Sequence, residues 1–508
     1  MATSGCKEKK NRLLPFSWGI RVRRGTAPIV RSDESANAVL SSVTPVMSSL
    51  SAIYQVFVDR FDPGADPPAA PERAAEEGTV RRPFGAPPDR PPTGRDLQGG
   101  TLHGVAARLE HVAALADAVY LTPITRAPSN HKYDVADFEA IDEHFGGEAG
   151  LAALVAGARR RGLQLFVDAV FNHVGDRHPW AREAARLRGT GWRGYDHLRE
   201  LDLAAPAVRA ALVGPGGVVE RLVARGADGL RLDCANDLGR AFCGEVAAAI
   251  ARAGGTGGAI GEVMAWPAGL VGDGGLDGAM SYWLRAALLG ALADEAEIGP
   301  AARALDRFAE ALPPAALQRS WTVLSSHDTP RLSDAVGFDE RRARLLLALQ
   351  FAYPGVPLLY YGEEVGLSGG ADPGCRGAMV WDEARWDLGR LAFVRALVGL
   401  RRAHPALRAG RYVPLPVAPP ALAFARAAEA PGGTIVCVAN LSERPIRARV
   451  LLPLEGFYDA LPAEDLLSPG GERAAVEQGA VVVGLPPYGV RWLQGRDDHA
   501  SGYRFWKT

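Results

Sequence analysis

Residues 229–262 read GLRLDCANDLGRAFCGEVAAAIARAGGTGGAIGE, a strand–helix–strand pattern. A short apolar run at 229–232 is followed by a helical pattern at 242–252 and by a second apolar run at 259–261. A connection of this length predicts parallel strands, because parallel neighbours cannot be joined by a tight turn. Each run ends in a carboxylate, Asp233 after the first and Glu262 after the second.

The same unit recurs toward both ends of the chain. The strand candidates lie at 53–57, 118–121, 165–167, 229–232, 259–261, 278–280, 322–324 and 358–361. Helical patterns between them include residues 150–160, 207–225, 242–252 and 341–351. Eight such repeats over about 350 residues predict a TIM (β/α)8 barrel. The rival fold is a doubly wound open sheet, which normally has a glycine-rich turn after its first strand, and no such turn follows residue 57.

Changes in composition predict the domain boundaries. The barrel is expected at 49–408, with a Pro-, Ala- and Arg-rich surface loop at 62–92 and a short excursion at about 174–200 after the third strand. After residue 408, Pro-rich turns alternate with β-type runs at 434–438, 448–452 and 480–483, which predicts an antiparallel β-sandwich domain at 409–492 and a tail at 493–508. Residues 1–48 are basic and lack the apolar core of a secretory signal, so we expect a disordered leader or a mis-assigned start.

Composition excludes several classes of function. Apolar residues make up 47% and charged residues 23% of the 508 positions, as in ordinary globular proteins. No apolar run approaches the ~18 residues of a membrane-spanning helix. The 57 basic and 58 acidic residues leave a net charge of -1, which gives no electrostatic reason to expect a nucleic acid or a membrane as partner. Five scattered cysteines without a C-x-x-C pair favour a reducing, cytoplasmic location.

Charged and polar side chains stand where four of the expected strands end, the position of catalytic groups in barrel enzymes. Three carboxylates, Asp233, Glu262 and Asp328, are therefore expected to meet at one barrel mouth. Such groups are costly to bury unless they are paired or have a task. The neighbouring polar positions are Asp168, Asn172, His173, Arg231 and His327.

This arrangement suits the cleavage of an acetal, which needs one acid for the leaving oxygen and one carboxylate for the oxocarbenium-like carbon. Retention of configuration requires the two groups ~5–5.5 Å apart, and neighbouring strands lie ~4.8 Å apart. Asp233 and Glu262 on consecutive strands fit that separation. Arg231 lies two residues before Asp233, so both side chains face the same side and the guanidinium is expected to keep Asp233 ionised.

Four segments together resemble the α-amylase family of glycoside hydrolases (family thirteen), in the family's order and within roughly residues 50–490. They are DAVFNH (168–173), GLRLD (229–233), GEV (261–263) and SHDT (326–329). The resemblance implies a retaining hydrolase with Asp233 as nucleophile, Glu262 as acid/base and Asp328 as a transition-state stabiliser. It further implies that Arg231, His173 and His327 position the sugar ring and that Asp168 supports the site.

Further motifs resemble the neopullulanase/cyclomaltodextrinase/maltogenic amylase group: IYQVFVDRF (53–61), DLQGG (96–100), NHKYD (130–134), CAND (234–237) and DPGCR (372–376). By that resemblance, Tyr133 stacks on the sugar at the cleaved position, since a flat ring suits the apolar face of a pyranose. Asp134, Asp372 and Arg376 would also contact the substrate, the last two on its non-reducing side. Cys234 is interpreted as a packing residue.

The sequence also departs from that group. Residues 1–48 are too few for the N-terminal β domain with which its members build a dimer, so both a monomer and a homodimer stay open. No cofactor is expected to be required. Ca²⁺ is the alternative, because Asn172, Glu200 and Asp202 would supply oxygen ligands, but Asp237 stands where calcium-binding relatives have a histidine.

The sequence thus predicts a retaining α-glucan hydrolase that cleaves α-1,4 linkages, with α-1,6 linkages also in view, in maltodextrins, cyclodextrins or pullulan. Three alternatives stay open. One is a transglycosylase or a trehalose-synthase-like sugar isomerase with the same covalent intermediate. Another is an α-1,6-glucosidase in which Asp134 and a partner arginine close the pocket. The third is a glucan-binding protein without catalysis.

Overall fold

The computed structural model describes residues 50–67, 69, 78–86, 92–428, 432–454, 457–471 and 473–495. The expected leader at 1–48 and residues 496–508 of the expected tail lie outside these described residues, as does much of the expected loop at 62–92.

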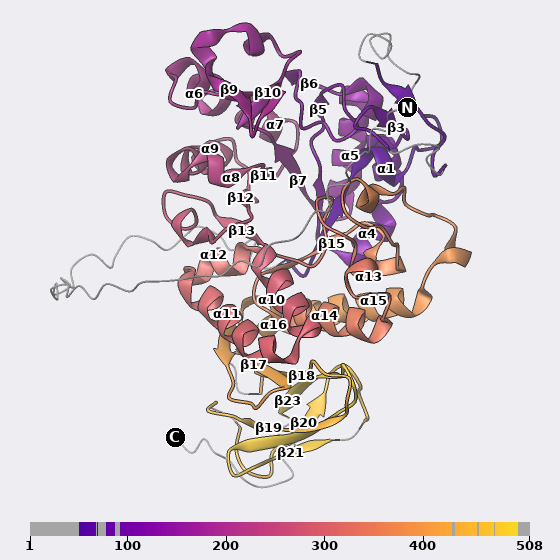
Figure 1. Cartoon of the computed structure of the whole chain (residues 1–508), viewed down its shortest axis with the longest axis vertical. Helices are drawn as coiled ribbons and strands as arrows, with labels where there is room; N and C mark the ends of the chain where they lie inside the picture. The colour runs from indigo at the N-terminus through magenta and orange to yellow at the C-terminus, as the bar shows by residue number, and fades with distance from the viewer. Residues whose placement is uncertain are drawn as a thin grey trace, which may run out of the picture. The chain divides into compact units, whose positions relative to one another are not determined.

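Eight parallel strands close into a barrel in the order β1-β15-β14-β13-β12-β11-β7-β4, which confirms the predicted (β/α)8 fold over the rival open sheet. Each strand overlaps one of the eight apolar runs (Figure 1). Their bounds are β1 (Ile53–Val56), β4 (Ala118–Leu121), β7 (Gln164–Ala169), β11 (Gly229–Leu232), β12 (Gly258–Val263), β13 (Gly278–Ser281), β14 (Trp321–Val323) and β15 (Val356–Tyr360).

Helices follow the strands and cover the barrel. The helix predicted over 207–225 is in fact two helices, because Gly214, Pro215, Gly216 and Gly217 interrupt it, and Gly216 adopts a φ of 70°. The helices are α1 (Val58–Phe61), α3 (Leu102–Ala107), α4 (Leu109–Leu115), α5 (Gly147–Arg160), α6 (Pro206–Val213), α7 (Val218–Ala224), α8 (Ala235–Leu238), α9 (Arg240–Arg252), α10 (Tyr282–Ala293), α11 (Ile298–Ala311), α12 (Pro314–Arg319), α13 (Leu332–Ala335), α14 (Glu340–Ala352), α15 (Leu388–Ala403) and α16 (Pro405–Ala409).

Large side chains fill the barrel interior. Tyr120, Phe166, Met280 and Trp321 are fully buried in one cluster there. The Trp321 ring centroid lies 5.2 Å from that of Tyr120 and 5.3 Å from that of Phe166. The barrel is therefore a packed core rather than a pore, and a substrate can reach only its mouth.

The excursion after the third barrel strand forms a three-stranded antiparallel sheet, ordered β8-β10-β9. Its strands are β8 (His173–Gly175), β9 (Leu187–Trp192) and β10 (Tyr195–Leu201). Figure 1 shows β9 and β10 at the end of the molecule opposite the C-terminal strands. Two small pairs of strands complete this part of the chain: β2 (Val80–Arg81) with β3 (Asp96–Leu97), and β5 (Thr125–Arg126) with β6 (Asp137–Ile141).

The C-terminal region is an antiparallel sheet in the order β16-β17-β18-β23-β20-β21-β22-β19, as its alternating pattern predicts. The last strand continues to Gly495, three residues into the expected tail. The strands are β16 (Arg411–Pro414), β17 (Ala421–Ala427), β18 (Ile435–Asn440), β19 (Ile446–Leu451), β20 (Pro462–Asp465), β21 (Ala474–Glu477), β22 (Ala480–Leu485) and β23 (Val490–Gly495).

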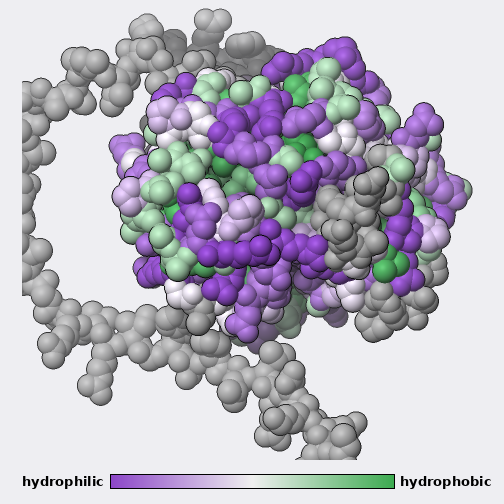
Figure 2. Space-filling model, turned by 90° about the horizontal axis from the view of Figure 1, so that it is seen from above, coloured by the Kyte–Doolittle hydropathy of each residue, from purple (hydrophilic) through white to green (hydrophobic). Residues whose placement is uncertain are grey.

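The described surface in the view of Figure 2 is mainly hydrophilic, and its hydrophobic residues lie in small groups between polar ones. None of the helices in the described part of the chain combines the length and the apolar character needed to cross a bilayer.

Candidate active site

The two neighbouring strands β11 and β12 place two carboxylates side by side. Leu232 pairs in register with Gly261, so the next residues, Asp233 and Glu262, leave the barrel at the same level. One carboxylate oxygen of Asp233 and one of Glu262 lie within 4.8 Å of each other. This separation is close to the ~5–5.5 Å that a retaining glycosidase needs.

One guanidinium joins three carboxylates beneath the barrel mouth. Nη1 of Arg231 lies 2.9 Å from Asp168 Oδ2 and 3.1 Å from Asp233 Oδ1, and its Nη2 lies 3.0 Å from Glu262 Oε1. The Arg231 and Asp168 side chains are fully buried, whereas those of Asp233 and Glu262 are 9% and 11% exposed. Three acids around one fixed cation form a rigid, electrostatically coupled group.

Burial shifts the pKa values of Asp233 and Asp168 more than the arginine does. Burial, and then the neighbouring Glu262 carboxylate, raise the pKa of Asp233 well above its ordinary value, while Arg231 lowers it by less. Burial likewise raises the pKa of Asp168 against the opposing effect of Arg231. Arg231 therefore favours the ionised form of Asp233, as expected, but burial and Glu262 outweigh it and the net shift of the pKa is upward.

A second charged group lies at the ends of β14 and β15. Arg376 Nη2 lies 3.1 Å from Asp328 Oδ1 and 3.1 Å from Asp372 Oδ2. Its Nε donates to the main-chain oxygen of His327 at 2.8 Å. Arg376 therefore fixes both acids in place, and Asp372, with its side chain 46% exposed, remains open to solvent.

Uncharged aromatic and imidazole groups form the wall between these clusters. The Tyr133 hydroxyl lies 2.7 Å from Asp168 Oδ2 and 2.6 Å from His327 Nε2. Burial lowers the pKa of His173 to about 4 and that of His131 to about 3, and it lowers the pKa of His327 well below the ordinary value. All three imidazoles are thus neutral near pH 7 and serve as hydrogen-bonding groups rather than as cations.

These residues surround a cavity of about 310 Å³. The sequence-predicted residues on its wall are Tyr133, His173, Asp233, Glu262, Asp328, Asp372 and Arg376. Four others lie behind that wall: Asp168, Arg231 and His327 bind one another or Tyr133, and Asp134 is turned toward Ser129 and Arg95. None of these four side chains borders the cavity.

The cavity also has walls that sequence reasoning missed. Trp192, at the end of β9, lies over His173 with ring centroids 4.8 Å apart, and its Nε1 donates to Asp237 Oδ2 at 3.0 Å. Arg193, Leu198 and Met264 line the same cavity. An aromatic residue in the excursion is the only sequence signal for Trp192, and it does not say which way the hairpin folds.

Cys234 contacts both carboxylates, although the sequence indicated a packing residue. Its main-chain N–H donates to Glu262 Oε2 at 3.0 Å, and its Sγ lies 3.2 Å from Asp233 Oδ2. A left-handed φ of 48° turns the residue into this position. Burial and the two nearby carboxylates raise the pKa of the thiol, so it stays protonated and acts as a donor.

The residues proposed for calcium were Asn172, Glu200 and Asp202. The main-chain oxygen of Asn172 accepts from Leu201, and Asp202 Oδ1 accepts from the Ala204 N–H at 3.0 Å. Among the described residues, the one group of three His, Cys, Asp or Glu ligand atoms within 4.8 Å is Asp233, Cys234 and Glu262. Because Ca²⁺ takes about six to eight hard oxygens, that group, with its thiol, is not a calcium site.

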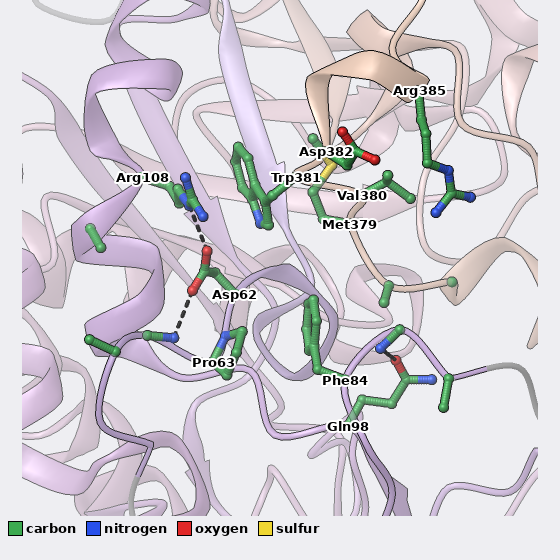
Figure 3. A pocket seen from close by; sticks show the side chains of 17 residues that line it. Asp62, Pro63, Phe84, Gln98, Arg108, Met379, Val380, Trp381, Asp382 and Arg385 are labelled. Carbon is green, nitrogen blue, oxygen red and sulfur yellow. Dashed lines mark hydrogen bonds and ion pairs between the residues drawn. The ribbon is translucent and has the colours of Figure 1, made fainter.

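A larger cavity, of about 890 Å³, lies beside the loop that follows Arg376 and holds none of the three acids (Figure 3). Figure 3 shows Asp62 turned toward Arg108, whose Nε lies 2.5 Å from Asp62 Oδ2, while Asp382 stands apart on the opposite wall. Its carboxylates do not converge, so the chemistry points to the smaller cavity.

Comparison with known proteins shows the family of this chain. Residues 55–197 and 274–390 match the family described as alpha amylase, catalytic domain. A cyclomaltodextrinase of Geobacillus thermopakistaniensis is 33% identical over 86% of this chain and 75% of its own length, and neopullulanase 2 of Thermoactinomyces vulgaris is 33% identical over 72% of this chain and 65% of its own.

Solved structures of similar proteins share this fold. Ttha1563 of Thermus thermophilus is 32% identical, with a TM-score of 0.75 over 89% of this chain and 100% of that one. The cyclic α-maltosyl-(1→6)-maltose hydrolase of Arthrobacter globiformis is 27% identical, with a TM-score of 0.74 over 90% of this chain and 100% of that one. The chain therefore belongs to the alpha-amylase family of glycoside hydrolases.

Proposed function

We propose that this protein hydrolyses α-glucans with retention of configuration, through a covalent intermediate on Asp233. The observation that supports this most directly is the pair of carboxylates within 4.8 Å at the mouth of a packed barrel. In the first step, Asp233 attacks the anomeric carbon while Glu262 gives a proton to the departing glycosidic oxygen. In the second, Glu262 takes a proton from water, which attacks the same carbon and releases Asp233 as a carboxylate.

Asp328 is proposed to bind hydroxyls of the reacting ring and to stabilise its developing positive charge. Arg376 fixes this carboxylate through the ion pair of 3.1 Å. Tyr133 and His173 form the wall on which the ring rests. Asp168, Arg231 and His327 hold Tyr133 and the catalytic acids in place, so they act as positioning residues behind the cavity wall.

The proposed substrates are maltodextrins, cyclodextrins and pullulan, cleaved at α-1,4 and to some extent at α-1,6 linkages. The names of the relatives support this range, since they include cyclomaltodextrinases, neopullulanase 2 and maltogenic amylases. The proposal needs no cofactor. It leaves both a monomer and a homodimer open, and it includes a cytoplasmic location, which the four free thiols of the described cysteines support.

The test is a product analysis after incubation with maltoheptaose, β-cyclodextrin or pullulan. Proton NMR during the first minutes should show α-anomeric maltose or panose ahead of mutarotation. Excess maltose as acceptor separates the alternatives: longer sugars would indicate a transglycosylase, and rearranged disaccharides an isomerase. Turnover of isomaltose but not maltotriose would identify an α-1,6-glucosidase. Maltotriose binding without any product would contradict the proposal and favour a glucan-binding protein.

The Cys234 thiol gives a prediction about the nucleophile. The Cys234 thiol donates to Asp233 Oδ2 at 3.2 Å, and this hydrogen bond lowers the pKa of Asp233. Cys234→Ala removes it. Since Asp233 must be ionised to attack, the acidic limb of the pH profile of kcat/KM should move to higher pH, and kcat should fall about three- to tenfold. Cys234→Ser keeps a donor and should resemble the parent. An unchanged acidic limb in the alanine variant would show that the thiol only fills space.

A further inference from the structure

A third cavity, of about 540 Å³ and called here the Trp266–Trp283 cavity, adjoins the segment that follows Glu262. Its walls are the indoles of Trp266 and Trp283 and the part of α11 that carries Arg307 and Glu310. Trp266 is 38% exposed. A partly exposed tryptophan that lines a cavity next to a catalytic segment indicates a binding site more strongly than a scattered exposed apolar residue does.

The two indoles are held in place by the protein alone. The Trp266 and Trp283 ring centroids lie 5.0 Å apart with an interplanar angle of 86°, and the Trp266 and Phe308 centroids lie 5.8 Å apart at 88°. Trp283 Nε1 donates to the main-chain oxygen of Ala265 at 3.2 Å. This corner is therefore built before any ligand arrives, which reduces the entropy lost on binding.

The Trp266–Trp283 cavity lies close to the catalytic cavity along the chain. Met264 lines the catalytic cavity, and Trp266 lines the Trp266–Trp283 cavity. Two residues of extended chain span at most about 7 Å, so the walls of the two cavities come close together at residues 264–266. The direction follows from the acid: Glu262 protonates the departing oxygen, so the departing sugars lie on its side, while Asp372 and Arg376 lie with Asp328 at the ends of other strands.

We propose that the Trp266–Trp283 cavity binds the leaving-group end of long α-glucan chains. This proposal rests on the proposed function and adds to it a binding site for chain length. The flat indole offers a surface for the apolar face of a glucose ring. Arg307 and Glu310, three residues apart and therefore neighbours on α11, supply a donor and an acceptor for its hydroxyls.

The experiment compares Trp266→Ala, Trp266→Phe and Phe338→Ala with the parent on maltotriose and maltoheptaose. Phe338 is a matched control, because its ring is 69% exposed and borders neither cavity. Trp266→Ala should raise KM for maltoheptaose about tenfold and leave kcat/KM for maltotriose within about twofold. Trp266→Phe should recover most of the loss, and Phe338→Ala should change neither substrate.

A direct binding measurement separates this proposal from the proposed function. Calorimetry with maltoheptaose on Glu262→Gln, with and without Trp266→Ala, needs no turnover. Weaker binding of maltoheptaose, with maltotriose affinity unchanged, supports the cavity even in a protein that cleaves nothing. An equal loss of affinity for both sugars would overturn the proposal, because the indole would then only support the catalytic loop. No loss of affinity for either sugar would also overturn it, because the indole would then not contact the substrate. Melting curves of the variants identify any unfolding.

Discussion

Asp233→Asn is expected to lower kcat on maltotriose by at least about 10⁴-fold, because it removes the carboxylate that forms the covalent intermediate. Asn has nearly the shape of Asp, so the contact of its side chain with Arg231, now 3.1 Å from Oδ1, can persist. The amide has no charge and a poor nucleophilic oxygen. The measurement is the steady-state rate, followed by mass spectrometry for a glycosylated protein, which should be absent.

The matched control is Asp237→Asn. Asp237 borders the same cavity and accepts from Trp192 Nε1 at 3.0 Å, but it lies away from Arg231 and Glu262. We expect its kcat to stay within about tenfold of the parent, since the change affects only a partly exposed hydrogen bond and an exposed ion pair with Arg193 at 3.9 Å. Comparable losses in both variants would mean that any altered charge near the cavity stops turnover, and Asp233 would lose its assignment as nucleophile.

Asp233→Asn should lower kcat without lowering the stability of the folded protein. Burial and Glu262 raise the pKa of Asp233, so the folded protein disfavours its ionised form. A raised pKa in the folded state adds stability at low pH that is lost as pH rises through that pKa. Near pH 7, the uncharged asparagine side chain avoids this loss of stability. The melting temperature of Asp233→Asn should therefore equal or exceed that of the parent. An inactive variant that is no less stable cannot owe its inactivity to unfolding.

The strand–helix repeat made the barrel predictable, and the barrel made the acids predictable. Each apolar run appears as a barrel strand because the run is too short for a helix and is separated by helix-length segments. Once the strands are parallel, residues that follow consecutive strands must share one mouth, and this requirement places Asp233 beside Glu262. Gly214 and Pro215 signal the break between α6 and α7 in the sequence. The helical periodicity on both sides nevertheless favoured one continuous helix.

Other features depend on contacts that no local pattern encodes. The direction of the β9–β10 hairpin, which carries Trp192 to His173, is set by its packing and not by its sequence. The left-handed backbone of Cys234, with a φ of 48°, turns its thiol toward Asp233, whereas an ordinary backbone would not. The pKa of Asp233 could not be judged either, because burial is a property of the whole mouth and outweighs the adjacent Arg231.

Glu262→Gln is expected to lower kcat/KM on maltotriose about 10³-fold, the usual contribution of a general acid. The glutamine cannot protonate the leaving oxygen, and its single amide oxygen can keep only one of the two contacts of Glu262, which are with Arg231 Nη2 through Oε1 and with the Cys234 N–H through Oε2, both 3.0 Å in the parent. α-Maltosyl fluoride tests this role, because fluoride leaves without a proton. The first step on this substrate should stay within about tenfold of the parent, with a burst of fluoride before slow hydrolysis of the intermediate.

A second variant, Glu262→Ala, tests the later half of the reaction. Azide needs no general base, so it should attack the anomeric carbon of the ester, displace the Asp233 carboxylate and give α-maltosyl azide with net retention. Asp233→Asn should give no such product, because it forms no ester. Glu200→Gln serves as the control for a carboxylate near the mouth, since Glu200 pairs with His173 on the excursion sheet and borders neither catalytic acid. If Glu262→Gln lost activity equally on maltotriose and on the fluoride, Glu262 would be a binding residue and the proton would have to come from another group.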